Sequence, residues 1–159
     1  MDVSYILDDL NDAQRQAVTS ESKNLLVLAG AGSGKTKVLV HRIAWLIKAL
    51  SNSTHSILSV TFTNKAANEM TGRIEQILDQ PIPEMWCGTF HSISNRLLRR
   101  HYKEAGLEKD FSILDSDDQL RVIKRNLKEL DNAEDQWPAE KVRWQINNWK
   151  DEALRPKDV

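Results

Sequence analysis

The sequence predicts an α/β fold: a parallel sheet with flanking helices, followed by an all-helical segment. Three short runs rich in aliphatic or aromatic residues, at positions 25–29, 57–62 and 85–90, are typical of buried strands. They recur at intervals of about 30 residues, the length of a strand–helix–strand unit. Helical periodicity fills the gaps between them, and this alternation favours a parallel sheet with helices on its faces.

A helix is predicted after each strand, because mainly apolar residues recur there three or four positions apart. This spacing places the residues on one face, which can pack against the sheet. The positions are Leu39, Ile43, Leu46, Ile47 and Leu50 in the first helix, Ala66, Met70, Ile74, Ile77 and Leu78 in the second, and Ile93, Leu97 and His101 in the third.

From about residue 115 the pattern changes to helices alone. Ser116, followed three residues later by Gln119, predicts a capping box at the start of a helix. A break at residues 131–132 separates this helix from a second one, for which Pro138 suits the first turn. The apolar positions of the two helices are Leu120, Ile123, Leu127 and Leu130, then Ala139, Val142, Ile146 and Trp149. Because a complete doubly wound domain usually has five or more parallel strands, we expect a piece of a larger protein.

The composition is that of a globular protein without a membrane span. The chain has 159 residues, 40% hydrophobic and 28% charged, and no apolar run of about 18 residues. Its acidic N-terminus is unlike a secretory signal peptide, and its single cysteine excludes an internal disulfide framework, so we expect a cytoplasmic protein. The 22 basic residues against 23 acidic ones give a net charge of −1, which does not signal a polybasic nucleic-acid binder.

The first predicted strand leads directly into a segment with the spacing of a phosphate-binding P-loop. Its small residues let successive backbone N–H groups face one anion, and the helix that follows adds its positive end. Lys35 can reach the β and γ phosphates of a nucleotide, and the Thr36 hydroxyl can ligate Mg²⁺. The spacing predicts a nucleotide site, with a flexible glycine turn as the alternative. The P-loop residues are Ala29, Gly30, Ala31, Gly32, Ser33, Gly34, Lys35 and Thr36.

Gln14, upstream of the loop, is a candidate reader of the base. A glutamine amide donates to one atom and accepts from another, so it can pair with adenine at N6 and N7. Simple solvation on a helix surface is the alternative.

Several segments stand in the order and spacing of UvrD/Rep-type superfamily 1 DNA helicases, which the sequence resembles over its whole length. They are Leu-Asn-x-x-Gln at 10–14, the P-loop, Val-Thr-Phe-Thr-Asn-Lys-Ala-Ala-Asn-Glu-Met at 60–70, and Gly-Thr-Phe-His-Ser at 88–92. The resemblance implies a P-loop NTPase (RecA-like) fold, with residues 1–114 in motor domain 1A and residues 115–159 as the truncated start of helical subdomain 1B. It also implies an ATP-dependent 3′–5′ helicase that moves on single-stranded DNA and acts at DNA duplex junctions. Nucleotide-excision and mismatch repair proteins are the implied partners.

The resemblance also implies residue roles. Gln14 reads adenine, while Lys35 and Thr36 hold the phosphates and Mg²⁺ of ATP. Lys37 lies near the nucleotide, where relatives often carry arginine, and the lysine keeps the charge but lacks the planar group. The residues implied to grip single-stranded DNA are Thr61, Phe62, Thr63, Asn64, Thr89, Phe90 and His91.

Physical chemistry agrees with DNA contact at these positions. Ligands of open parallel sheets bind beyond the carboxyl ends of the strands, where threonine and asparagine side chains can bind phosphates. The rings of Phe62, Phe90 and His91 could stack on bases, worth ~1–3 kcal/mol each. Alternatively, both phenylalanines close the core of the sheet and His91 is a helix-start residue without a ligand.

A P-loop motor also needs an acidic motif that helps to hold Mg²⁺ and polarises the attacking water. The candidate at residues 111–115 is rejected, because Ser112 interrupts the strand, Ser116 stands where a glutamate is needed, and Asp115 has a helix-start role. We expect the motif and the second motor domain beyond residue 159. The chain alone should then bind Mg·ATP weakly and not unwind DNA.

Some features leave alternatives open. The basic stretch from Arg96 to Lys103 could follow a DNA backbone or be a solvated helix face, and Trp144 could be exposed or buried under a neighbouring helix. His41 and His55 indicate only surface positions. Rival functions are a self-contained P-loop enzyme such as a small-molecule kinase, and a short ATP-controlled DNA- or protein-binding module without turnover.

Overall fold

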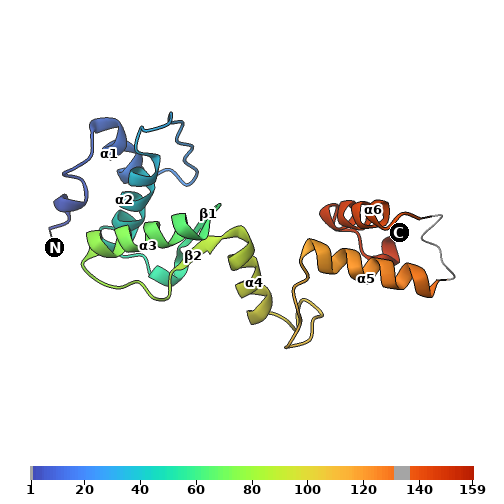
Figure 1. Cartoon of the computed structure of the whole chain (residues 1–159). Helices are drawn as coiled ribbons and strands as arrows, with labels where there is room; N and C mark the ends of the chain where they lie inside the picture. The colour runs from blue at the N-terminus through green and yellow to red at the C-terminus, as the bar shows by residue number, and fades with distance from the viewer. Residues whose placement is uncertain (1, 131–136) are drawn as a thin grey trace. The chain divides into compact units, whose positions relative to one another are not determined.

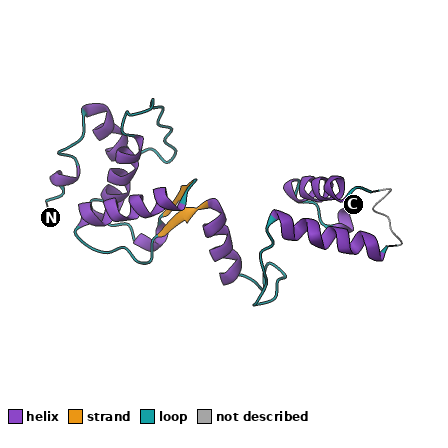
Figure 2. Cartoon of the chain, viewed as in Figure 1, coloured by secondary structure: helices purple, strands orange, loops and turns teal. Residues whose placement is uncertain are grey.

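The structure, a computed structural model, describes residues 2–130 and 137–159. The chain divides into two compact units, Met1–Gly106 and Leu107–Val159. Within the described residues the fold is mixed α/β, with six α-helices and one small sheet (Figures 1 and 2). The elements are η1 (Ser4–Ile6), α1 (Asp12–Thr19), α2 (Lys35–Lys48), η2 (Thr54–Ser56), β1 (Leu58–Thr61), α3 (Asn64–Leu78), β2 (Trp86–Thr89), α4 (Phe90–Arg100), α5 (Ser116–Glu129), α6 (Ala139–Asp151) and η3 (Pro156–Asp158).

Strands β1 and β2 pair in parallel, which confirms the second and third predicted strands. Leu58 lies opposite Trp86 and Thr61 opposite Thr89. Helix α3 connects the two strands and contacts both. Parallel strands need such a crossover, because the chain must return to the same end of the sheet before it can run in the same direction again.

The first predicted strand is wrong, because residues 25–29 lie outside any strand. Leu26 and Leu28 are 80% and 86% exposed. A strand also needs neighbours for its backbone N–H and C=O groups. Among the described residues, the strands β1 and β2 pair only with each other. The apolar run therefore has no partner strand in this part of the chain.

The core of the first unit lies mainly between α2 and α3. The stripe predicted on α3 is largely confirmed, with Met70, Ile74 and Leu78 buried. On α2 the prediction is only partly correct: Ile43 is buried, but Leu39 is 41% exposed. Helix α2 packs against both α1 and α3, so its buried residues extend over a wider face than one stripe. These residues are Val38, Val40, His41, Ile43 and Ala44.

His41 is buried, so its predicted surface position is wrong. Its Nδ1 donates to the carbonyl oxygen of Ile6 at 2.6 Å. This bond satisfies one polar group of the ring and ties α2 to η1, whose Ile6 is fully buried. Exposed His55, in contrast, pairs with Glu84, as a surface position allows.

The second unit is built on the contact between α5 and α6. Ile123 and Leu127 of α5 and Ala139 of α6 are buried together, and Leu120, Val142 and Ile146 pack against them. The two predicted helices are thus confirmed, with Pro138 at the N-cap of α6 instead of in its first turn. The predicted break at residues 131–132 lies outside the described residues. Within the two described ranges, no helix is both long and apolar enough to span a membrane.

Ile74→Ala should lower the free energy of unfolding of the first unit by about 2–5 kcal/mol. Ile74 is fully buried in the cluster formed by α2 and α3, so truncation leaves a cavity. Leu50→Ala is the control, since Leu50 is 52% exposed, and should cost about 0.5 kcal/mol or less. Urea unfolding followed by circular dichroism measures both, and equal losses would contradict this description of the core.

Candidate functional site

The P-loop makes a tight turn into α2. Gly32 and Gly34 have φ angles of +74° and +83°, in the left-handed region that favours glycine. Gly34 is the N-cap of α2, so Lys35 and Thr36 are the first two residues of the helix. The loop therefore delivers an ammonium and a hydroxyl group to the start of a helix, where anions are favoured.

The side chain of Lys35 folds back over its own loop. Its Nζ donates to the carbonyl oxygens of Ala29 at 3.1 Å and Gly30 at 2.5 Å. Ser33 also donates to the Gly30 carbonyl oxygen, through Oγ at 2.7 Å. Lys35 and Thr36 are exposed, and a phosphate would offer the ammonium charged acceptors, which make stronger hydrogen bonds than neutral carbonyls. The residues of the loop therefore fit a nucleotide phosphate.

Gln14 lies against the P-loop and is not simply solvated. Its Nε2 donates to the carbonyl oxygen of Ser33 at 3.2 Å, while its Oε1 accepts from the backbone N–H of Asn11 at 3.1 Å. The second contact belongs to the capping box that begins α1. A Cβ atom on Gly34 would lie 2.9 Å from Nε2 of Gln14, so the close approach also depends on that glycine.

Lys37 connects the same region to the N-terminal segment. Its Nζ donates to the carbonyl oxygen of Asp9 at 2.6 Å. Sequence reasoning missed this contact, because a backbone carbonyl leaves no signal in the residue type that carries it. The structure thus brings Gln14, Lys37 and the P-loop residues into one neighbourhood, although residues 10–14 are distant from the loop in sequence.

A second group of predicted residues meets where β1 and β2 end. Thr61 and Thr89 lie side by side in the sheet, and each strand leads into a helix. The Oγ1 of Thr63 accepts from the N–H of Ala66 at 3.1 Å, and the Oγ1 of Thr89 accepts from the N–H of Ser92 at 3.2 Å. Two capped helix starts therefore lie at one edge of the sheet. We call this edge the strand-end surface, made of Phe62, Thr63, Asn64, Phe90 and His91.

The rings on the strand-end surface face outward. Phe62 is 93% exposed and Phe90 is 59% exposed, so the core position considered for both phenylalanines is wrong. Their ring centroids are 6.1 Å apart in an edge-to-face arrangement. His91 is exposed as well, whereas Thr89 is buried and its hydroxyl is used in the helix cap. The surface thus presents aromatic faces beside polar backbone groups.

The P-loop does not follow a strand of this sheet, in contrast to the prediction. The sequence placed the loop at the carboxyl end of a strand in the same sheet, but residues 25–29 form no strand. Within the described part of the chain, the loop joins the rest of the unit through α2 and through Gln14.

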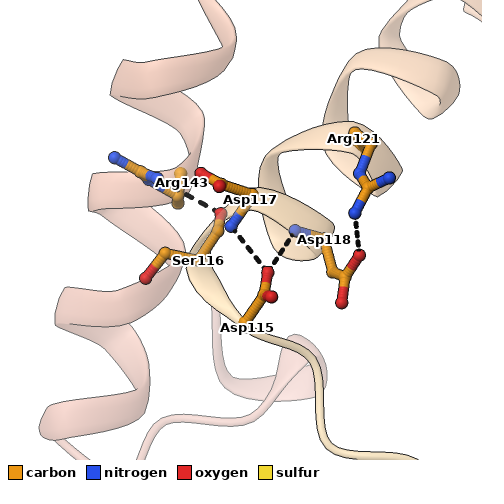
Figure 3. Close-up of polar contacts among 6 residues, drawn as sticks. All are labelled: Asp115, Ser116, Asp117, Asp118, Arg121 and Arg143. Atoms are coloured by element: carbon orange, nitrogen blue, oxygen red, sulfur yellow. Dashed lines mark hydrogen bonds and ion pairs between the residues drawn. The ribbon is translucent and has the colours of Figure 1, made fainter.

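Asp115 has the helix-start role that excluded it from the acidic motif (Figure 3). One of its carboxylate oxygens accepts from the N–H groups of Asp117 at 2.9 Å and Asp118 at 2.7 Å, which makes Asp115 the N-cap of α5. The predicted Ser116 capping box is wrong: Ser116 is the first helical residue, and the Gln119 side chain donates to Asn147 instead. Two adjacent residues suited to capping made the choice ambiguous, because both serine and aspartate are common caps.

The structure also places the basic stretch from Arg96 to Lys103 and the side chain of Trp144. The guanidinium of Arg96 lies 4.3 Å from the centroid of the Trp86 ring, so this part of the basic stretch packs on β2. Trp144 is 64% exposed within the described residues, and its burial under a neighbouring helix is wrong.

The sequence matches the family described as the UvrD/REP helicase N-terminal domain over residues 10–159. It is 57% identical over all 159 residues to DNA helicase II of Salmonella typhimurium, and equally to DNA helicase II of Escherichia coli. It is 43% identical over 155 residues, 98% of the chain, to the ATP-dependent DNA helicase PcrA of Bacillus subtilis. The chain spans 22% of the length of the first two relatives and 21% of the third.

Asp115→Ala should destabilise α5 by about 0.5–2 kcal/mol, because two backbone N–H groups lose their acceptor. Ser116→Ala is the matched control and should leave the helix nearly unchanged, since no cap depends on its side chain. Hydrogen exchange of the first-turn amides of α5 reports the difference. A larger effect from Ser116→Ala would restore the capping box that the structure rejects.

Proposed function

Because the chain belongs to the UvrD/REP helicase N-terminal domain family, we propose that it is the ATP-binding N-terminal segment of an ATP-dependent DNA helicase. The observation that carries this proposal is the P-loop, with Lys35 at the start of α2 and Gln14 hydrogen-bonded to the loop. In this proposal, residues 1–114 belong to a RecA-like motor domain 1A and residues 115–159 begin the helical subdomain 1B.

The proposed nucleotide site uses residues of α1, of α2 and of the P-loop that leads into α2. Lys35 would exchange its carbonyl acceptors for phosphate oxygens, and the Thr36 hydroxyl would hold Mg²⁺. Gln14 would read the adenine edge by donating and accepting at once, and Lys37 would add positive charge nearby. ATP hydrolysis supplies the free energy for movement along DNA when the rest of the motor is present.

The proposed DNA contact is the strand-end surface. Its exposed rings can stack on bases without regard to sequence, and the two helix starts favour phosphates. This explains how a chain with a net charge of −1 could hold a single strand. For the whole protein we propose a 3′–5′ helicase that acts at duplex junctions in the cytoplasm. Its proposed partners are nucleotide-excision and mismatch repair proteins.

Lys35→Ala should weaken Mg·ATP binding at least about tenfold, because a charge-assisted hydrogen bond contributes ~1.5–3 kcal/mol. Lys48→Ala is the matched control: Lys48 ends the same helix and bonds only to Gln80 in the described contacts. Calorimetric titration of the 159-residue chain measures both affinities. Equal affinities in the two variants would contradict the assigned role of Lys35.

Released phosphate, assayed in the same samples with single-stranded DNA, tests the reaction. We expect none, because no acidic motif follows a strand within the described residues. DNA-stimulated release would contradict the proposal that this segment is incomplete as a motor. ATP-dependent changes in DNA affinity without turnover would favour a binding module.

Phe62→Ala should weaken binding of an oligothymidylate by about fivefold or more, since one stacked base contributes ~1–3 kcal/mol. The slope of affinity against salt should not change, because the ring carries no charge. Tyr5→Ala, at another exposed aromatic of the first unit, is the control. Fluorescence anisotropy measures the affinities, and equal losses in both variants would count against the strand-end surface.

A further inference from the structure

Strand β2 passes into helix α4 with no residue between them, since β2 ends at Thr89 and α4 begins at Phe90. Gly88 is buried at this junction. A Cβ atom on Gly88 would lie 2.5 Å from Oγ of Ser92 and 3.3 Å from Cγ1 of Ile93. The first distance is too short for any real contact, so an added methyl group must displace Ser92 or the start of α4.

The backbone of Gly88 does not itself demand glycine. Positive φ angles among the described glycines occur at Gly32, Gly34 and Gly106, and not at Gly88. The close contacts with Ser92 and Ile93, and not the backbone conformation, therefore disfavour a side chain at this position. The neighbour that would be displaced, Ser92, can be changed independently.

Ser92 is exposed, but its hydroxyl is bonded on two sides, so rotating it away from Gly88 would break both hydrogen bonds. It donates to the carbonyl oxygen of Thr89 at 3.0 Å and accepts from Oγ1 of Thr89 at 3.1 Å. The backbone N–H of Ser92 also donates to Oγ1 of Thr89. Thr89 and Ser92 thus form a closed cluster of hydrogen bonds directly above Gly88.

This cluster sits beside the ring pair of the strand-end surface. Phe90 is the first residue of α4, and its ring meets that of Phe62 at a centroid distance of 6.1 Å. Any shift of the first turn of α4 moves Phe90 and His91 relative to Phe62, which belongs to the loop after β1.

We propose that Gly88 is a positioning residue: by lacking a side chain, it lets α4 start directly on β2, with Ser92 packed on the strand, and so sets Phe90 beside Phe62. The link from this geometry to DNA rests on the proposed function. The geometry itself does not, and the two parts can be tested separately.

The geometric test compares Gly88→Ala with the double variant Gly88→Ala/Ser92→Ala in the 159-residue chain. Nuclear Overhauser effects between the Phe62 and Phe90 rings report their approach. We expect them to be lost in Gly88→Ala and restored in the double variant, because removing the Ser92 hydroxyl leaves Cγ1 of Ile93 as the nearest atom, at 3.3 Å, which requires a shift of only a few tenths of an ångström. Gly72→Ala, at a helical glycine with open space around its Cβ position, is the control and should keep them.

Each outcome decides the proposal. Ring contacts that persist in Gly88→Ala would overturn it, and so would a double variant that fails to recover them. If Gly88→Ala does not fold but the double variant folds with the ring contacts of the original chain, the steric role of Gly88 is supported.

The link between Gly88 and DNA is tested by measuring the affinity of each variant for an oligothymidylate. Gly88→Ala should lose about fivefold or more, as expected for one misplaced stacking ring. The double variant should match Ser92→Ala alone, so that any phosphate contact of the hydroxyl is removed from both. Failure of the unmodified chain to bind the oligonucleotide would contradict the proposed DNA contact, while the ring contacts would still decide the role of Gly88.

Discussion

The packing of α2 against α3 holds both candidate sites in one unit. Ala44 of α2 and Ile74 of α3 are fully buried in the shared cluster. Helix α2 carries the P-loop at its N-terminus, and α3 carries Thr63 and Asn64 at its own. Because interiors are close-packed, rigid contact between two helices transmits a displacement of one to the other. The same core therefore holds the helix that begins at the P-loop and the helix that begins at the strand-end surface in one packed unit.

The candidate site residues of this unit lie at the N-termini of helices. Gly34 begins α2, Thr63 begins α3 and Thr89 begins α4. The caps differ in a way that matches the proposed ligands. The glycine cap leaves the first N–H groups of α2 without a side-chain acceptor and hence available to a phosphate, whereas both threonine hydroxyls are already bonded to the backbone. Anion binding is therefore favoured most at the P-loop.

The glycine turn into α2, both paired strands and the buried face of α3 could be predicted from the sequence, because each depends on local spacing. The remaining features depend on contacts that spacing does not encode. An apolar run such as 25–29 indicates burial but does not name the strands that must flank it. The burial of His41 depends on the Ile6 carbonyl, which is 35 residues away. At residues 115 and 116, two capping residues compete, and only the backbone geometry decides between them.

Lys35 at the P-loop, and Thr63 and Thr89 at the strand ends, already have hydrogen-bond partners within the protein, so a ligand that binds these side chains must replace those contacts. At the P-loop, Lys35 would give up two neutral carbonyl acceptors for anionic phosphate oxygens, and the attraction between opposite charges favours this exchange. At the strand ends, an exchange of threonine cap bonds for bonds to phosphate has a smaller margin, since the hydroxyls are neutral and already well placed. The rings of Phe62 and Phe90 are exposed, and a base that stacks on them does not have to replace a hydrogen bond. We infer that phosphate binding at the P-loop depends chiefly on charge. Binding of single-stranded DNA at the strand-end surface depends chiefly on the relative placement of the Phe62 and Phe90 rings.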